Sequence, residues 1–227
     1  GDDGSTPEDL RTAVAALHAA ADEYLRAEDP ESFDLAELER AHMGALLTLS
    51  GCRVLVPLLA EAGEVGLTPE GRLGEKTQEL SIVTVAGPDG RRAMPVFSSV
   101  ETMRAWNPEA RPIPVPMPQA AIAAAQDETA LIIVDPGTPS SEIGVRRTQL
   151  EAVALAQTVK PAWADGPVQM AFQASIAGNE QVQAVFLMPG DPEARLLAPE
   201  LDVVLALRPG LNQEDVSELL DGLQRQW

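Results

Sequence analysis

Residues 131–137 read Leu-Ile-Ile-Val-Asp-Pro-Gly, and this stretch decides the fold. Its first four residues are all apolar, which is typical of a β-strand that is covered on both faces. Asp-Pro-Gly then turns the chain sharply, because proline fixes its φ angle and glycine tolerates a positive φ. The stretch therefore predicts a buried strand that ends directly in a tight turn.

A ladder of prolines precedes this strand, where residues 111–118 read Arg-Pro-Ile-Pro-Val-Pro-Met-Pro. Alternate N–H groups of an extended chain point the same way, so the donors that the prolines lack all lie on one side. The other side can still pair, which predicts an edge strand that no further strand can join. A solvated polyproline II segment is the alternative, but the alternating Ile113, Val115 and Met117 favour the strand.

A β-hairpin and a short helix are predicted before the ladder. Leu80–Val85 and Ala93–Phe97 have the composition of strands, and Gly87–Gly90 between them reads as a turn. Ser98 and Glu101 then form the pattern of a capping box, which predicts that a helix begins there.

Two amphipathic helices are predicted at the N-terminus. Thr6 and Pro7 start the first one, with the hydroxyl as cap and proline at the first helical position. Asp34 and Glu37 form a capping box for the second, which ends at Gly51. The short link between them predicts an antiparallel pair. A buried strand from Cys52 to Leu59 should follow.

The C-terminal third predicts a smaller unit of helices and strands. A polar loop after the Asp-Pro-Gly turn should lead to a helix around Arg147–Thr158, and Lys160–Gly166 reads as a linker. Beyond the linker we expect, in order, a helix around Phe172, strands at Val182–Met188, Ala194–Leu197 and Leu201–Leu207, and a last helix capped by Asn212.

Together these elements predict an α+β fold, with a mixed sheet and flanking helices, a helical pair before it and a smaller α+β unit after it. The predicted domains are a helical pair at residues 1–50, an α+β domain at 51–159 and a small C-terminal α+β domain at 160–227. The Gly-, Glu- and Pro-rich segment Glu61–Gln78 is predicted to be a loop.

The composition excludes several classes of protein. Hydrophobic residues make up 45% of the 227 residues, enough for a substantial core. The net charge of −19 argues against binding to nucleic acid or to an anionic membrane surface. No apolar run approaches the ~20 residues that span a bilayer. Cys52 is the single cysteine and excludes an intramolecular disulfide, which fits the cytoplasm.

Three short segments follow one another in a distinctive order. Residues 54–57 read Val-Leu-Val-Pro, residues 94–101 read Met-Pro-Val-Phe-Ser-Ser-Val-Glu with Trp106 after them, and the buried strand ends in Asp-Pro-Gly. In order and spacing they resemble the N-terminal domain of the SseB family, named for enhanced serine sensitivity, over about residues 36–158. The C-terminal unit is similar in pattern to the separate C-terminal domain of that family.

The resemblance implies a protein without an assigned enzymatic mechanism. The residues that match the family pattern are of the kinds that pack a core or turn the chain. The chain also lacks the GxSxG, GxGxxG, Walker A and HExxH motifs. We therefore expect a protein that is not an enzyme and that requires neither cofactor nor metal.

Few residues are candidates for chemistry. A metal site would need His18 and His42 to converge with a carboxylate such as Glu39; packing within the predicted helices is the simpler interpretation. Cys52 lies beside Arg53 and could be an activated thiol, but it opens an apolar strand and favours a buried, inert cysteine.

Three residues are candidates for binding a ligand. Asp135 ends a buried strand, where catalytic carboxylates often lie in α/β folds, although the Pro-Gly after it also fits a turn-forming aspartate. Arg146 and Arg147 could hold an anion at a helix start, or pair with carboxylates in a chain this acidic. The leading hypothesis is a protein that acts through protein–protein contact. The alternatives are a small-metabolite enzyme or binder near Asp135, and self-association through the N-terminal helices, as in a homodimer.

Overall fold

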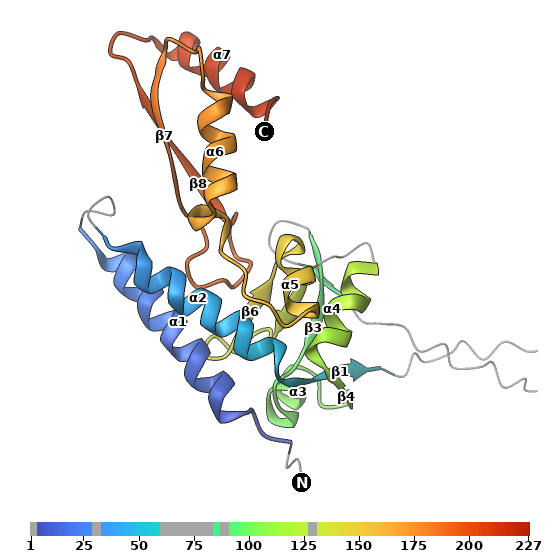
Figure 1. Ribbon diagram of the computed structural model, residues 1–227. Coiled ribbons are helices and arrows are strands. Elements are labelled where there is room, and N and C mark those ends of the chain that lie inside the picture. Colours follow the sequence, from blue (N-terminus) through green and yellow to red (C-terminus); the bar gives the residue numbers. More distant parts are fainter. Residues whose placement is uncertain (1–3, 29–32, 60–83, 87–90, 127–130) are drawn as a thin grey trace, which may run out of the picture.

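The computed structural model describes residues 4–28, 33–59, 84–86, 91–126 and 131–227 and has the predicted α+β fold (Figure 1). The helices are α1 (Glu8–Arg26), α2 (Leu35–Ser50), α3 (Val100–Trp106), α4 (Met117–Gln126), α5 (Leu150–Ala154), α6 (Gly166–Ser175) and α7 (Gln213–Gln224), with the 3-10 turns η2 (Arg147–Gln149) and η3 (Ala162–Ala164). The strands are β1 (Arg53–Leu58), β2 (Val85–Ala86), β3 (Arg92–Val96), β4 (Arg111–Pro116), β5 (Ile132–Val134), β6 (Ile143–Val145), β7 (Val182–Pro189) and β8 (Leu201–Leu207).

The central sheet is mixed, with the strand order β2-β3-β5-β6. β3 and β5 run parallel, whereas β2 pairs with β3 and β6 pairs with β5 in the antiparallel sense. All three residues of β5 are buried, as the apolar run predicts. The predicted hairpin of β2 and β3 is present. Its turn, the segment Glu61–Gln78 and residues 80–83 of its first strand lie outside the described residues.

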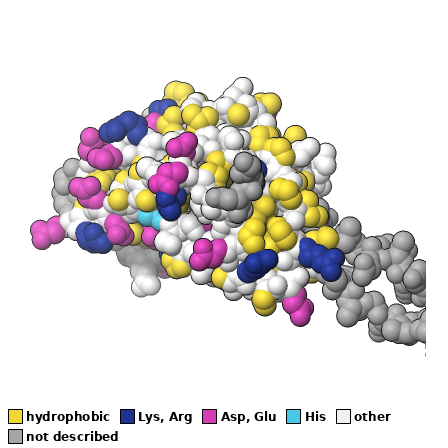
Figure 2. Space-filling model, turned by 90° about the horizontal axis from the view of Figure 1, so that it is seen from below, with side chains coloured by type: hydrophobic (Ala, Val, Ile, Leu, Met, Phe, Trp, Pro, Cys, Tyr) yellow, Lys and Arg dark blue, Asp and Glu magenta, His cyan; other side chains and the backbone are white. Residues whose placement is uncertain are grey.

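The proline ladder forms the edge strand β4, which pairs antiparallel with β1. Leu55 of β1 exchanges backbone hydrogen bonds with Phe97 on its other side, at 2.8 and 2.9 Å, so its groups point away from Pro114 opposite. The prolines of β4 therefore occupy the positions whose donors would face outward, as predicted. Figure 2 shows hydrophobic side chains gathered on the side of the molecule where Figure 1 places β1, β4 and α4.

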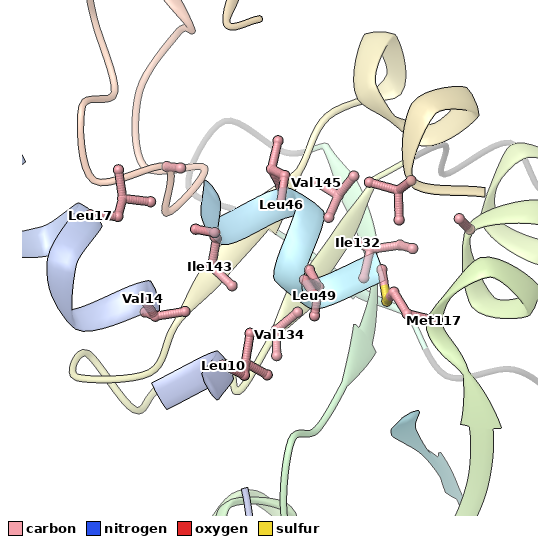
Figure 3. Packing of buried hydrophobic residues seen from close by; sticks show 14 of the residues in the cluster. Leu10, Val14, Leu17, Leu46, Leu49, Met117, Ile132, Val134, Ile143 and Val145 are labelled. Atoms are coloured by element: carbon pink, nitrogen blue, oxygen red, sulfur yellow. The ribbon is translucent and has the colours of Figure 1, made fainter. Parts of the chain in front are cut away.

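The N-terminal helices pack side by side and supply much of the core. Figure 3 shows side chains of α1, α2 and α4 converging with those of β5 and β6. The labelled members of this cluster are Leu10, Val14, Leu17, Leu46, Leu49, Met117, Ile132, Val134, Ile143 and Val145. The apolar stripe of α1 is thus buried within the chain itself. No helix in the described part of the chain is long and apolar enough to cross a membrane.

The C-terminal unit consists of the β7–β8 hairpin with α6 and α7 on one side of it (Figure 1). Leu205 and Leu207 of β8 pack with Leu219 and Leu223 of α7. Asn212 caps α7 as predicted, and it forms a capping box with Asp215. Trp163, in the predicted linker, is buried in the main hydrophobic cluster and fastens this unit to the rest of the protein.

Two predictions of strands were wrong. β6 lies in the segment predicted to be a polar loop, because only the neighbouring β5 gives Ile143-Gly144-Val145 a partner. Ala194–Leu197 is not a strand, since Ala194 and Leu196 have φ angles of 54° and 59°. This loop covers β6: Gly144 donates its N–H to the carbonyl of Ala194 at 2.6 Å. A Cβ on Gly144 would lie 2.3 Å from Leu196, so only glycine fits.

Helix boundaries also differ from the predictions. The helix expected over Arg147–Thr158 ends earlier, at Ala154, and Ala156 takes a φ of 51°. Thr6 does not cap α1, whose N-cap is Pro7. Ser98 does not cap α3 either; the hydroxyl of Ser99 accepts the Thr102 N–H instead. Both displaced hydroxyls belong to a cluster around Asp135.

Candidate functional site

Asp135 is completely buried, with an exposed fraction of 0%. Its Oδ1 accepts hydrogen bonds from the Ser98 N–H at 2.8 Å and the Thr102 hydroxyl at 2.7 Å. Its Oδ2 accepts one from the Ser98 hydroxyl at 2.5 Å. The three donors surround the start of α3. Asp135 therefore fastens the end of β5 to α3, and its own φ of 50° forms the turn.

The Asp135 cluster extends to the N-terminal segment. The Ser98 hydroxyl donates to Asp135, so it accepts from the Thr6 hydroxyl at 2.7 Å. Arg53 donates to the carbonyls of Ser98 and Ser5 at 2.6 and 2.9 Å. A surface pocket nearby includes Thr6 but not Asp135. The geometry of this carboxylate is that of a structural tie.

Arg146 is also buried, and it forms an ion pair with Asp191. The same guanidinium nitrogen donates to the carbonyl of Ala198 at 2.9 Å. Asp191 further accepts the backbone N–H groups of Arg195 and Leu196, at 3.2 and 2.8 Å. Because both charges have several partners, burying them is tolerable. The pair holds the loop between β7 and β8 against the end of β6.

Arg147 points elsewhere and is exposed. It lines a shallow groove of about 380 Å³ between α4 and α5, together with Ile122 and Leu150. The groove has apolar walls and Glu151 beside Arg147. Arg147 and Arg146 are adjacent in sequence, but Arg147 is exposed at this groove and Arg146 is buried in its ion pair with Asp191.

The structure does not bring the three predicted binding residues together. β5 and β6 are antiparallel, with Val134 opposite Ile143 and Ile132 opposite Val145. Asp135 and Arg146 each follow the C-terminal end of one of these strands. They consequently lie at opposite ends of the strand pair, about 13 Å apart along the strands at ~3.3 Å per residue. One small ligand could not be held by both side chains.

His42 is 4% exposed and lies in the centre of the core. The Gln149 side chain accepts the Arg146 N–H through its oxygen at 2.9 Å, so its nitrogen donates to His42 Nε2 at 3.2 Å. Nδ1 then carries the proton, and among the described residues it has no hydrogen-bond partner. Burial, and secondly the charge of Arg146, lower the pKa of His42 to about 4. His42 is therefore neutral near neutral pH.

The other candidates for chemistry are separate from His42. His18 Nε2 lies 3.2 Å from the carbonyl of Glu142. The Cys52 thiol donates to the carbonyl of Thr48 at 3.2 Å, and burial is the main cause that raises its pKa. A protonated thiol is a poor nucleophile. Within the described ranges, no three His, Cys, Asp or Glu side chains cluster as metal ligands would.

The feature that sequence reasoning missed is an exposed apolar face on the β7–β8 hairpin. Phe186 and Val204 lie opposite each other in the register and are 52% and 42% exposed. Ala184 and Ala206 pair on the same face. Successive side chains alternate between faces, so α6 and α7 cover the residues between these. Both strands are apolar on nearly every position, a pattern that predicts cover on both faces; the structure shows cover on one.

We expect Asp135→Ala to destabilise the protein by about 3 kcal/mol, because it takes the acceptor from three donors, of which the two on Ser98 are buried and the Thr102 hydroxyl is partly buried. Asp135→Asn is the matched variant. Its oxygen can still accept, the Ser98 hydroxyl can turn to donate to Thr6, and asparagine tolerates a positive φ, so it should lose less than half as much. Chemical denaturation measures both; an Asp135→Ala protein as stable as wild type would disprove the structural role.

His42 should make the fold sensitive to acid. Its pKa is about 4 in the folded protein against an ordinary 6.5, so the unfolded chain binds its proton first as the pH falls. The stability is complete above pH 6.5 and declines toward pH 4, by about 3 kcal/mol from this group. His42→Gln keeps an acceptor for Gln149 and should remove that part of the pH dependence. Equal pH profiles for the two proteins, from denaturation at each pH, would contradict this assignment.

Comparison with known proteins gives one family. The model of the SseB protein N-terminal domain matches residues 34–152, more than half of the 227 residues. No curated protein and no solved structure shows a significant match. The match includes α2, the central sheet, β1, β4, Asp135 and Arg146, whereas Asp191, the partner of Arg146, lies beyond it. The chain therefore belongs to the SseB family.

Proposed function

We propose that this SseB-family protein acts in the cytoplasm by binding another protein, without catalysing a reaction. The observation that carries this proposal is the apolar face of the β7–β8 hairpin, with Phe186 and Val204 about half exposed at its centre. Exposed apolar surface centred on an aromatic side chain is typical of contact sites between proteins.

The charges of the hairpin support the proposal. The chain has a net charge of −19, yet β7 and β8 carry a single charged residue, Asp202. Charged residues are depleted in the centres of protein interfaces. A neutral strip on an acidic protein is where another protein can approach without burying unpaired charge.

The alternative functions have less support. One alternative is an enzyme or binder of a small metabolite near Asp135, but the carboxylate of Asp135 is buried and engaged with Ser98 and Thr102. Self-association through the N-terminal helices would need their apolar stripes, but Leu10, Val14 and Leu17 are already buried inside the chain. Neither alternative accounts for the exposed hairpin.

The proposal includes the organisation of the chain. We assign residues 160–227 to a C-terminal domain of the SseB type, since a helix–strand–strand–helix unit follows the family match. Residues 51–159 and 1–50 are then the N-terminal-type domain and its helical pair. Contacts of Trp163 and Leu187 with the main cluster would fix the C-terminal unit in place, so that its open face is presented outward.

Affinity capture from the source cells tests the function. The wild-type protein should recover a defined protein, identified by mass spectrometry, and Phe186→Asp should reduce its recovery about tenfold or more, because a charge would be buried at the contact. Leu155→Asp is the matched control, since Leu155 is 58% exposed and lies at the C-cap of α5, outside the hairpin. Equal recovery by Phe186→Asp, or no protein recovered at all, would refute the proposal.

A further inference from the structure

The hydrogen bonds of the hairpin determine which backbone groups of β8 are free. Gly190 donates to the carbonyl of Glu200 at 3.1 Å, and Arg208 donates to that of Gln181 at 2.9 Å. Glu200 and Arg208 flank β8, and both use their backbone groups toward β7. Because these groups alternate in direction along a strand, the even-numbered residues of β8 direct their N–H and C=O groups toward β7. The odd-numbered residues, of which Val203 is one, therefore direct these groups outward.

The outward edge of β8 is open. In the part of the chain that the structure describes, β8 pairs with β7 alone, and Val203, Leu205 and Leu207 have no strand beside them. β8 contains neither a proline nor a charge at these positions. β4 differs, because every residue that faces outward from it is a proline and has no N–H to donate. An unblocked apolar edge is a template for another strand.

The two ends of this edge carry opposite charges. Asp202 and Arg208 are both exposed and, within the described residues, neither has an ion-pair partner. Their separation of six residues, about 20 Å in a strand, prevents them from pairing with each other. Both side chains lie on the same face of the hairpin as Val204, because their positions have the same parity. Asp202 is also close enough to Tyr24 of α1 for its charge to help raise the Tyr24 pKa, after burial.

We propose that β8 pairs antiparallel with β8 of a second copy of this chain, about a two-fold axis at Leu205. In this register Leu205 lies opposite its own counterpart and Val203 lies opposite Leu207, so that outward groups meet outward groups. Asp202 then lies opposite Arg208 of the other copy, twice by symmetry. This inference goes beyond the proposed function, because it concerns the edge of β8 and not the apolar face around Phe186.

The outer edge of β8 is complementary to the same edge of a second copy in its charges and in its backbone hydrogen-bonding groups. A second copy is therefore the partner that we propose. A two-fold contact requires that each residue meets its counterpart on the same patch, and the sequence from Asp202 to Arg208 does so with an acid opposite a base. The register centred on Val204 instead would leave Asp202 opposite Ala206 and put Arg208 opposite Glu200, whose carboxylate already accepts the Ala162 N–H at 3.0 Å.

The dimer also explains the hairpin. The β7–β8 sheet has two strands and is covered by helices on one face, whereas the pairing makes four continuous strands with α6 and α7 of both copies on that face. The Phe186 and Val204 side chains of both copies then form one apolar surface on the other face. That surface is twice as large as in a single copy and stays available to a further protein.

Charge exchange across the axis tests the pairing, with light scattering after size-exclusion chromatography as the measurement. Wild type should have twice the 24.1 kDa of one chain. Asp202→Arg and Arg208→Asp each put like charges opposite one another and should weaken the dimer about tenfold or more. An equimolar mixture of the two variants should recover a dimer, since every 202–208 contact is again between opposite charges. The double variant D202R/R208D should dimerise as well.

Asp221→Arg on α7 and Arg225→Asp at its C-cap change exposed residues, make the same changes of charge away from the edge and should stay dimeric. A monomeric wild type, single variants that stay dimeric, or a mixture that stays monomeric would each overturn the inference. A monomer that still captures a protein through Phe186 would refute the dimer and leave the proposed function standing. A dimer that captures nothing would refute that function alone.

Discussion

The backbone N–H and C=O groups at a strand edge need partners, and this requirement explains how the sheets of this protein end. β4 has no N–H donor on its outer edge, because its outward-facing residues are Pro112, Pro114 and Pro116. β8 has the full set of donors and no prolines. The same chain therefore closes one edge and leaves another open, and the open edge adjoins its exposed apolar face. We therefore expect binding to another protein chain at the open edge of β8 and the apolar face beside it.

Buried charges hold the parts of the protein together. Asp135 ties β5 to α3 and, through Ser98, to Thr6 before α1. Arg146 ties β6 to the β7–β8 loop through Asp191. A charge buried without partners would be strongly destabilising, so each of these residues requires its whole environment. They resemble catalytic residues in sequence because both roles favour a polar side chain at the end of a buried strand.

Much of the fold could be predicted because its signals are local. The prolines of β4 and the apolar run of β5 determine their own geometry. β6 could not be found in this way: Gly144 is a poor strand former, and it pairs only because β5 and the loop at Leu196 enclose it. The choice of Ser99 over Ser98 as the cap of α3 depends on Asp135, which is 37 residues away.

The candidate site could also be predicted only in part, because it depends on contacts between residues far apart in the sequence. Asp135 and Arg146 were identified as unusual, but only the antiparallel register shows that they face opposite ends. The apolar character of β7 and β8 was visible in the sequence. That one face would remain uncovered depends on where α6 and α7 pack, which periodicity does not determine.

Amide hydrogen exchange along β8 tests the central claim most directly. Val204 and Ala206 direct their N–H groups toward β7 and should be protected in the folded monomer and in the dimer alike. Val203, Leu205 and Leu207 direct theirs outward and are protected only if a second strand covers them. We expect these three amides to be protected in wild type and exposed in Asp202→Arg. Rapid exchange of the three in concentrated wild-type protein would contradict it.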